Sequence, residues 1–96
     1  MARRRHLADV AQEARLEYAR AMRAAGSAGE ALASARLVVA EDPYREDAWQ
    51  EIMRTEAHLG GPAAALPAFL ACERALKDVG LQPSRETRVL LERLRG

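Results

Sequence analysis

Histidine, cysteine and carboxylate side chains are the residues of this chain that could catalyse a reaction or bind a metal. The chain has two histidines, His6 and His58, and one cysteine, Cys72. A hydrolase needs a nucleophile beside a base, and a zinc site needs several ligands at characteristic spacings. These residues fall on different predicted elements and show neither pattern. We therefore expect no catalytic residue, no metal and no cofactor.

Structural roles account for these residues better. Cys72 is expected to pack as a small apolar side chain between helices, because one thiol cannot form an intrachain disulfide. His58 lies near the predicted end of a helix, where a cation interacts favourably with the helix dipole. The lone cysteine fits a reducing cytoplasm, and no run approaches the roughly 18 apolar residues of a membrane span. We expect a soluble, cytoplasmic protein with no membrane partner.

Basic residues are numerous but nearly balanced. The chain has 15 Lys and Arg residues against 14 Asp and Glu residues, for a net charge of +1. A domain that binds nucleic acid through its phosphates carries a stronger positive excess, so no direct nucleic-acid binding is expected. Arg3, Arg4 and Arg5 fall within residues 1–6, which we predict to be a basic N-terminal tail preceding one domain at residues 7–96.

The apolar residues recur every three or four positions, which is the period of one helix face, and nowhere alternate as in a strand. Glycine and proline residues separate the periodic stretches. Ser84 is predicted to cap the last helix, and Pro67 falls in the first turns of the fourth, where its missing amide costs least. The expected helices cover approximately residues 7–25, 28–41, 45–59, 62–79 and 85–95.

A repeat relates the first two predicted hairpins. A shift of about 34 residues, the length of a tetratricopeptide repeat, aligns several small and apolar positions. The aligned pairs are Gly26 with Gly60, Ala31 with Ala65, Leu32 with Leu66, Ala35 with Phe69, and Val38 with Cys72. The chain thus resembles an all-α, tetratricopeptide-like, right-handed stack of two helical hairpins, closed by a C-terminal capping helix as the fifth helix. An unrelated antiparallel bundle with glycines at equal intervals is the alternative.

Two longer motifs make a more specific resemblance. The segment AEDPYREDAWQEIMR covers Ala40 to Arg54, and LQPSRETRVLLERL covers Leu81 to Leu94. Both resemble the bacterial transcriptional activator domain, which occurs in the antibiotic regulatory proteins of actinomycetes. The resemblance extends from about Arg15 to Leu94. His58, Pro62 and Pro67 depart from the family's pattern, which leaves the start of the fourth helix open.

The resemblance implies a non-catalytic protein–protein interaction module of a transcriptional regulator. Such domains usually follow a winged-helix DNA-binding domain and help it to dimerise or to contact the transcription machinery. The implied partners are RNA polymerase, the other domains of a regulator, or a second copy of the chain. Only six residues precede the first predicted helix, so we expect an excised domain or a stand-alone relative. A tetratricopeptide adaptor unrelated to transcription is the competing hypothesis.

The partner surface is expected on the inner face of the first and third helices, where polar side chains should point away from the packing stripe. The candidate residues are Arg20, Arg23, Asp47, Gln50 and Arg54. Trp49 is expected in the core between the two helices of its hairpin, although an exposed tryptophan would be a common binding hot spot. The charged residues around the turn before Trp49 are expected to cap the helix and to be solvated.

Overall fold

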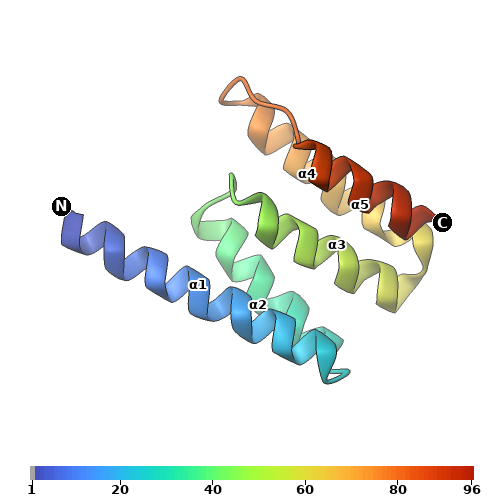
Figure 1. The fold of residues 1–96 in the computed structure, drawn as a ribbon, viewed down its shortest axis with the longest axis horizontal. Helices are drawn as coiled ribbons and strands as arrows, with labels where there is room; N and C mark the ends of the chain where they lie inside the picture. Colours follow the sequence, from blue (N-terminus) through green and yellow to red (C-terminus); the bar gives the residue numbers. More distant parts are fainter. Residues whose placement is uncertain (1) are drawn as a thin grey trace.

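The structure is a computed structural model that describes residues 2–96, with side chains described from residue 7 (Figure 1). It is all-α across this range, as predicted. Its elements are α1 (Ala2–Ala24), α2 (Ala28–Glu41), α3 (Glu46–Gly60), the 3-10 turn η1 (Pro62–Ala65), α4 (Leu66–Lys77) and α5 (Arg85–Arg95). The second and fifth helices have the bounds predicted from the sequence.

The helices form two layers. One layer consists of α1, α3 and α5, which lie side by side with α3 in the middle (Figure 1). The other consists of α2, packed against both α1 and α3, and α4, packed against both α3 and α5. Because α3 contacts every other helix, its side chains decide how the two hairpins and α5 are held together.

Turn chemistry sets the helix boundaries. Gly26 ends the first helix with φ of 85°, and Gly61 follows α3 with φ of 93°, a left-handed backbone that glycine adopts at little cost. Pro67 lies in the first turn of α4. The sequence predicted one helix from Pro62 to about residue 79, but α4 begins only at Leu66 and ends at Lys77. A 3-10 turn precedes it, because proline cannot donate the backbone hydrogen bond that would extend the helix from residue 62.

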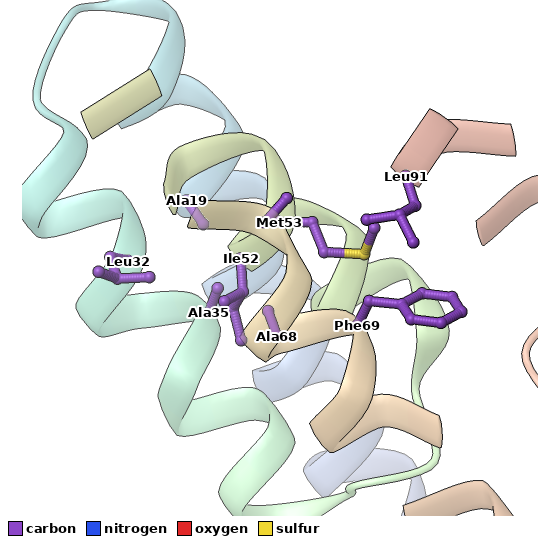
Figure 2. Close-up of a cluster of buried hydrophobic side chains, with 9 residues drawn as sticks. Ala19, Leu32, Ala35, Ile52, Met53, Ala68, Phe69 and Leu91 are labelled. Atoms are coloured by element: carbon purple, nitrogen blue, oxygen red, sulfur yellow. The ribbon is translucent and has the colours of Figure 1, made fainter. Parts of the chain in front are cut away.

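The core draws on every element (Figure 2). Its small members, such as Ala19 and Ala35, let neighbouring helices approach, and Met53 and Phe69 fill the remaining space. Leu91 brings α5 onto the same cluster, and its side chain points toward Met53 and Phe69 in Figure 2. The buried members of this cluster are Ala19, Leu32, Ala35, Ile52, Met53, Ala65, Ala68, Phe69 and Leu91.

Burial agrees with the 34-residue repeat at two of its aligned pairs. Ala31 and its counterpart Ala65 are both fully buried, as are Val38 and its counterpart Cys72. The aligned glycines differ, because Gly26 has a positive φ whereas Gly60 lies inside α3 and the positive φ falls on Gly61. Stacked repeats and an unrelated antiparallel bundle both accommodate these observations.

Two expectations concern Trp49 and the N-terminal residues. Trp49 packs against the core cluster as expected, but part of its ring stays exposed because α2 and α4 do not touch each other over it. The backbone of residues 2–6 is helical and forms the first part of α1. The side chains expected to form the basic tail, those of Arg3, Arg4 and Arg5, lie outside the described residues.

Candidate protein-interaction face

The surface of the α1, α3 and α5 layer that is turned away from α2 and α4 is called the interaction face below. Arg20 is exposed on it, and Arg23, Asp47 and Arg54 are partly exposed. Arg23 of α1 and Arg54 of α3 meet at Glu51, and the charge of Arg20 on α1 contributes to lowering the pKa of Asp47 on α3. The fifth candidate residue, Gln50, is 7% exposed and is not part of the open surface.

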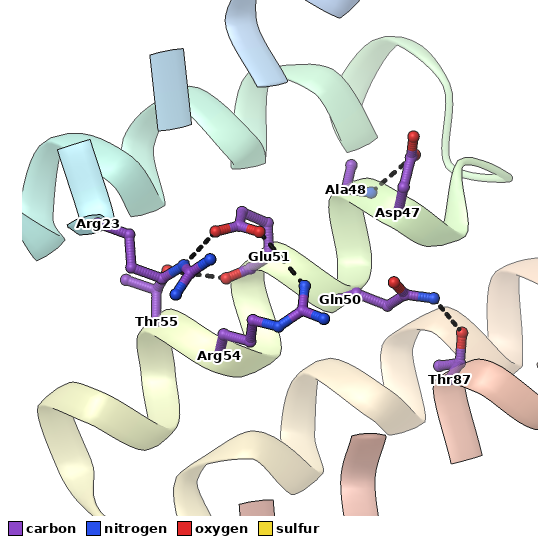
Figure 3. Close-up of polar contacts among 8 residues, drawn as sticks. All are labelled: Arg23, Asp47, Ala48, Gln50, Glu51, Arg54, Thr55 and Thr87. Atoms are coloured by element: carbon purple, nitrogen blue, oxygen red, sulfur yellow. Dashed lines mark hydrogen bonds and ion pairs between the residues drawn. The ribbon is translucent and has the colours of Figure 1, made fainter. Parts of the chain in front are cut away.

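A buried carboxylate organises the middle of this face (Figure 3). Glu51 is fully buried on α3, and its Oε1 accepts a hydrogen bond from Nε of Arg23 on α1. Its Oε2 lies 3.5 Å from Nη1 of Arg54, one helical turn further along α3. One carboxylate therefore orients two guanidinium groups from different helices. Glu51 was not among the residues expected from the sequence, although its position three residues before Arg54 was an available signal.

Gln50 takes part in the contact between α3 and α5. Its Nε2 donates to Oγ1 of Thr87 at 2.9 Å, and this hydroxyl donates to Oε1 of Glu46 at 2.7 Å. The same oxygen of Glu46 accepts a hydrogen bond from the backbone amide of Ser84 at 2.8 Å. Gln50 was expected to face a partner because the interaction surface was placed on the first and third helices alone. In the structure α5 covers Gln50.

The start of α3 carries an ion-pair cluster. Nε and Nη2 of Arg45 donate to the two carboxylate oxygens of Asp47, at 3.0 and 2.7 Å, and Nη2 also reaches Glu13 on α1. The hydrogen bond from Arg45 lowers the pKa of Asp47, and the bond to Asp47 raises the pKa of Arg45. These charges were expected to cap α3 and to be solvated. They also join α3 to α1.

Ser84 caps α5 as predicted. Its Oγ accepts a hydrogen bond from the backbone amide of Thr87 at 3.3 Å. The cap and the contacts of Gln50 and Glu46 therefore converge on the first turn of α5, which fixes where this helix enters the layer.

Trp49 lies on the opposite side, in a groove of about 560 Å³ between α2 and α4. Val39 and Ile52 are among the apolar residues that line the groove. The indole Nε1 donates to the carbonyl oxygen of Pro43 at 2.8 Å, so the polar edge of the ring is satisfied within the chain.

The expected structural role of Cys72 agrees with its surroundings. The side chain is fully buried, and burial raises the pKa of the thiol to about 12. The thiol is thus protonated near neutral pH and is a poor nucleophile. Across the described residues, no group of three or more His, Cys, Asp and Glu side chains is placed to hold a metal ion. No described helix has both the length and the hydropathy needed to cross a membrane.

The model of one protein family, the bacterial transcriptional activator domain, matches residues 1–95. The chain belongs to this family. The match is longer than the stretch from about Arg15 to Leu94 that the sequence motifs suggested, and it includes all of α1. Comparison with curated proteins and with solved structures gives no match.

Family membership places this activator domain among regulatory domains of transcription. The two sequence motifs that carried the resemblance coincide with structural contacts. The first motif contains the start of α3 with Arg45 and Asp47, and the second contains Ser84 and Thr87. Residues of both motifs meet where α5 docks on α3.

Proposed function

We propose that this activator domain is a non-catalytic protein–protein interaction module of a bacterial transcriptional regulator, and that it acts in the cytoplasm. Its partner is RNA polymerase or another domain of the regulator. The observation that carries the proposal is the interaction face, where Glu51 holds the charged side chains of Arg23 on α1 and Arg54 on α3 in place. A rigid, multi-helix surface of this kind suits recognition of a folded or extended protein partner.

The test measures binding of the purified domain to immobilised RNA polymerase holoenzyme and to an immobilised winged-helix domain of an activator from the same family. Arg20→Glu reverses one exposed charge on the interaction face and should weaken binding to the true partner. Arg74→Glu makes the same change on α4, outside this face, and should leave binding intact. Failure to bind either protein, or equal effects of the two substitutions, would contradict this mode of action.

A homodimer is the second mode, and an apolar stripe on α1 supports it. Leu7, Val10 and Tyr18 are 63%, 51% and 48% exposed. Together with Ala14 they recur every three or four residues on one face of α1. Tyr18 also shares a pocket with Leu37 of α2, which is 56% exposed. A second copy would remove this apolar surface from water.

Sedimentation of the domain over a range of concentrations tests the homodimer. Val10→Asp places a charge in the middle of the stripe and should shift a dimer to monomer. Val79→Asp makes the same change at another exposed valine and serves as the control. A wild-type domain that stays monomeric at high concentration would exclude dimerisation through α1.

A further inference from the structure

Two adjoining pockets on the interaction face are together lined by four arginines. One, of about 500 Å³, is lined by residues of α1, α3 and α5 that include Arg23, Arg54 and Arg93. The other, of about 360 Å³, lies between α3 and α5 and includes Arg54, Arg85 and Arg93. Because they share Arg54 and Arg93, they form one continuous surface, which we call the arginine pockets.

Positive charge exceeds negative charge in the arginine pockets. Glu86 is the one carboxylate among their lining residues, and the buried Glu51 lies beneath them. Four arginines against two carboxylates leave a local excess of two positive charges, larger than the +1 of the whole chain. Neither Arg85 nor Arg93 has an ion pair within the described part of the chain, so their guanidinium groups are available to a ligand.

The guanidinium groups of Arg23 and Arg54 are held in place before any ligand arrives. Glu51 binds both of them while 1% of its side chain is exposed, whereas about a third of each arginine side chain is exposed. Each arginine therefore keeps unused N–H donors directed to solvent. A planar guanidinium presents its donors in a geometry that matches a carboxylate, and orienting it in advance lowers the entropic cost of binding.

Apolar side chains lie between these charges. Val89, Leu90 and Leu94 of α5 line the arginine pockets, and Ala57 lines them from α3. Nucleic-acid sites typically combine arginines with aromatic side chains that stack on bases. No described Trp, Tyr or Phe side chain lines these pockets, and His58 has the one aromatic ring among the described residues that do. Arginines alternating with aliphatic side chains suit a peptide instead.

We propose that the arginine pockets bind an acidic peptide segment of the partner protein. Its carboxylates pair with Arg54 and Arg93, and its aliphatic side chains pack on Leu90 and Leu94 of α5. This inference rests on the proposed function and specifies the partner's chemistry. The peptide is expected to contain Asp or Glu next to Leu, Ile or Val, and its affinity should fall as salt is added.

The probe is a random 12-residue peptide library displayed on phage and selected on the wild-type domain. The selected peptides should be enriched in acidic residues beside aliphatic ones. The most frequent peptide, labelled with fluorescein, is then titrated against purified variants by fluorescence polarisation. Arg93→Gln removes an exposed charge of the arginine pockets and should weaken binding by about tenfold. Arg54→Gln should act in the same direction.

Arg88→Gln is the matched control, because it removes the same charge from the same helix at a residue that lines neither pocket. It should reduce affinity by no more than about twofold, because its guanidinium does not line the pockets and its remaining long-range effect is weakened by salt. Circular dichroism melts establish that every variant is folded. Selected peptides without acidic enrichment, or equal effects of Arg93→Gln and Arg88→Gln, would overturn the inference.

Single-stranded oligothymidylate competes in a further titration. If it displaces the peptide and its own binding depends on Arg93, these residues form a phosphate-backbone site and the peptide assignment is wrong. The proposed function and this inference can fail independently. If the domain binds RNA polymerase or a winged-helix domain and Arg93→Gln does not weaken that binding, the proposed function holds but the arginine pockets are not the contact site.

Discussion

Individual charged residues in this domain differ in what they hold in place. Glu51 orients Arg23 and Arg54 from a fully buried position, whereas the pair between Arg36 and Glu56 spans 3.5 Å at the surface. Surface pairs of the second kind contribute little to stability. A buried carboxylate that loses its partners is costly, so Glu51 couples the fold to the geometry of the interaction face.

The ion pair of Asp47 should make stability depend on pH in a defined direction. Its pKa in the folded domain is below the ordinary value of 3.8, because Arg45 donates two hydrogen bonds to the carboxylate. The folded state therefore binds the proton less well than the unfolded chain. This stabilisation is fully present above pH 3.8 and is lost as the pH falls through the lower folded value.

Urea unfolding of the wild type and of Asp47→Asn at pH 6 and at pH 3 measures this contribution. The variant should be less stable than the wild type at pH 6, and the difference should shrink at pH 3. A difference that stays the same at both pH values would show that the charge of Asp47 does not stabilise the fold.

The half-buried position of Trp49 sets the cost of removing its ring. Trp49→Ala should lower the free energy of unfolding by about 2 to 3 kcal/mol, somewhat less than the loss for a fully buried aromatic residue. Trp49→Phe keeps most of the apolar area but loses the hydrogen bond to Pro43, and should cost about 1 kcal/mol. Denaturant melts followed by circular dichroism give both values. A loss below about 0.5 kcal/mol for the alanine variant would mean that the ring contributes little packing.

At the scale of elements, α5 is held by both polar and apolar contacts. Leu91 enters the shared core, and Thr87 is fully buried with hydrogen bonds to Gln50 and Glu46. The same helix also supplies the aliphatic side of the arginine pockets. Its docking therefore serves stability and the proposed binding site together.

Thr87→Val tests the polar contact of α5 without changing the shape of the side chain. It removes the hydroxyl that accepts a hydrogen bond from Gln50, so the buried amide of Gln50 loses this partner. The expected loss is about 1 to 3 kcal/mol. Thr55→Val is the control, because its equally buried hydroxyl bonds only to the backbone oxygen of Glu51 in its own helix. Equal losses for the two variants would contradict a docking role for Thr87.

Deleting residues 84–96 tests α5 as a cap. The deletion exposes Met53, Phe69 and neighbouring apolar side chains, each worth about 1.5 to 3 kcal/mol when fully buried. The total is comparable to the stability of a small domain, so the truncated chain should be largely unfolded. Deleting only Arg95 and Gly96, which are exposed, should change little. An unchanged melting curve for the longer deletion would identify α5 as a detachable arm.

At the scale of the whole molecule, charge is balanced overall but concentrated on one face. The net charge of +1 provides little long-range attraction to DNA, although the arginine pockets carry a local excess. Any binding to nucleic acid by this domain should therefore be weak and sequence-independent, and it should disappear as salt is raised.

A gel-shift titration with random-sequence duplex DNA at physiological salt measures this property. The expected dissociation constant is no tighter than about 1 µM, as for non-specific binding through phosphates. Sequence-selective binding in the nanomolar range would show that this domain reads DNA directly, in contradiction to its charge balance.

Local patterns in the sequence determined the helices and most of their ends. Ser84 capped α5, Gly26 ended α1, and apolar spacing placed Ala31 and Val38 in the core. These features depend on residues close together in the chain, so periodicity and turn chemistry suffice to predict them. The family resemblance was also carried by local motifs and is confirmed over residues 1–95.

Contacts between distant residues were decided only by the tertiary structure. Glu51 and Arg23 form an ion pair although they are 28 residues apart in the sequence, and Gln50 and Thr87 form a hydrogen bond although they are 37 residues apart. Helical spacing shows which side of its own helix a residue occupies, but not which other helix covers that side. Gln50 was therefore expected to be open, whereas α5 buries it. Trp49 packs against the core as expected, but only the tertiary structure shows that α2 and α4 leave part of its ring uncovered.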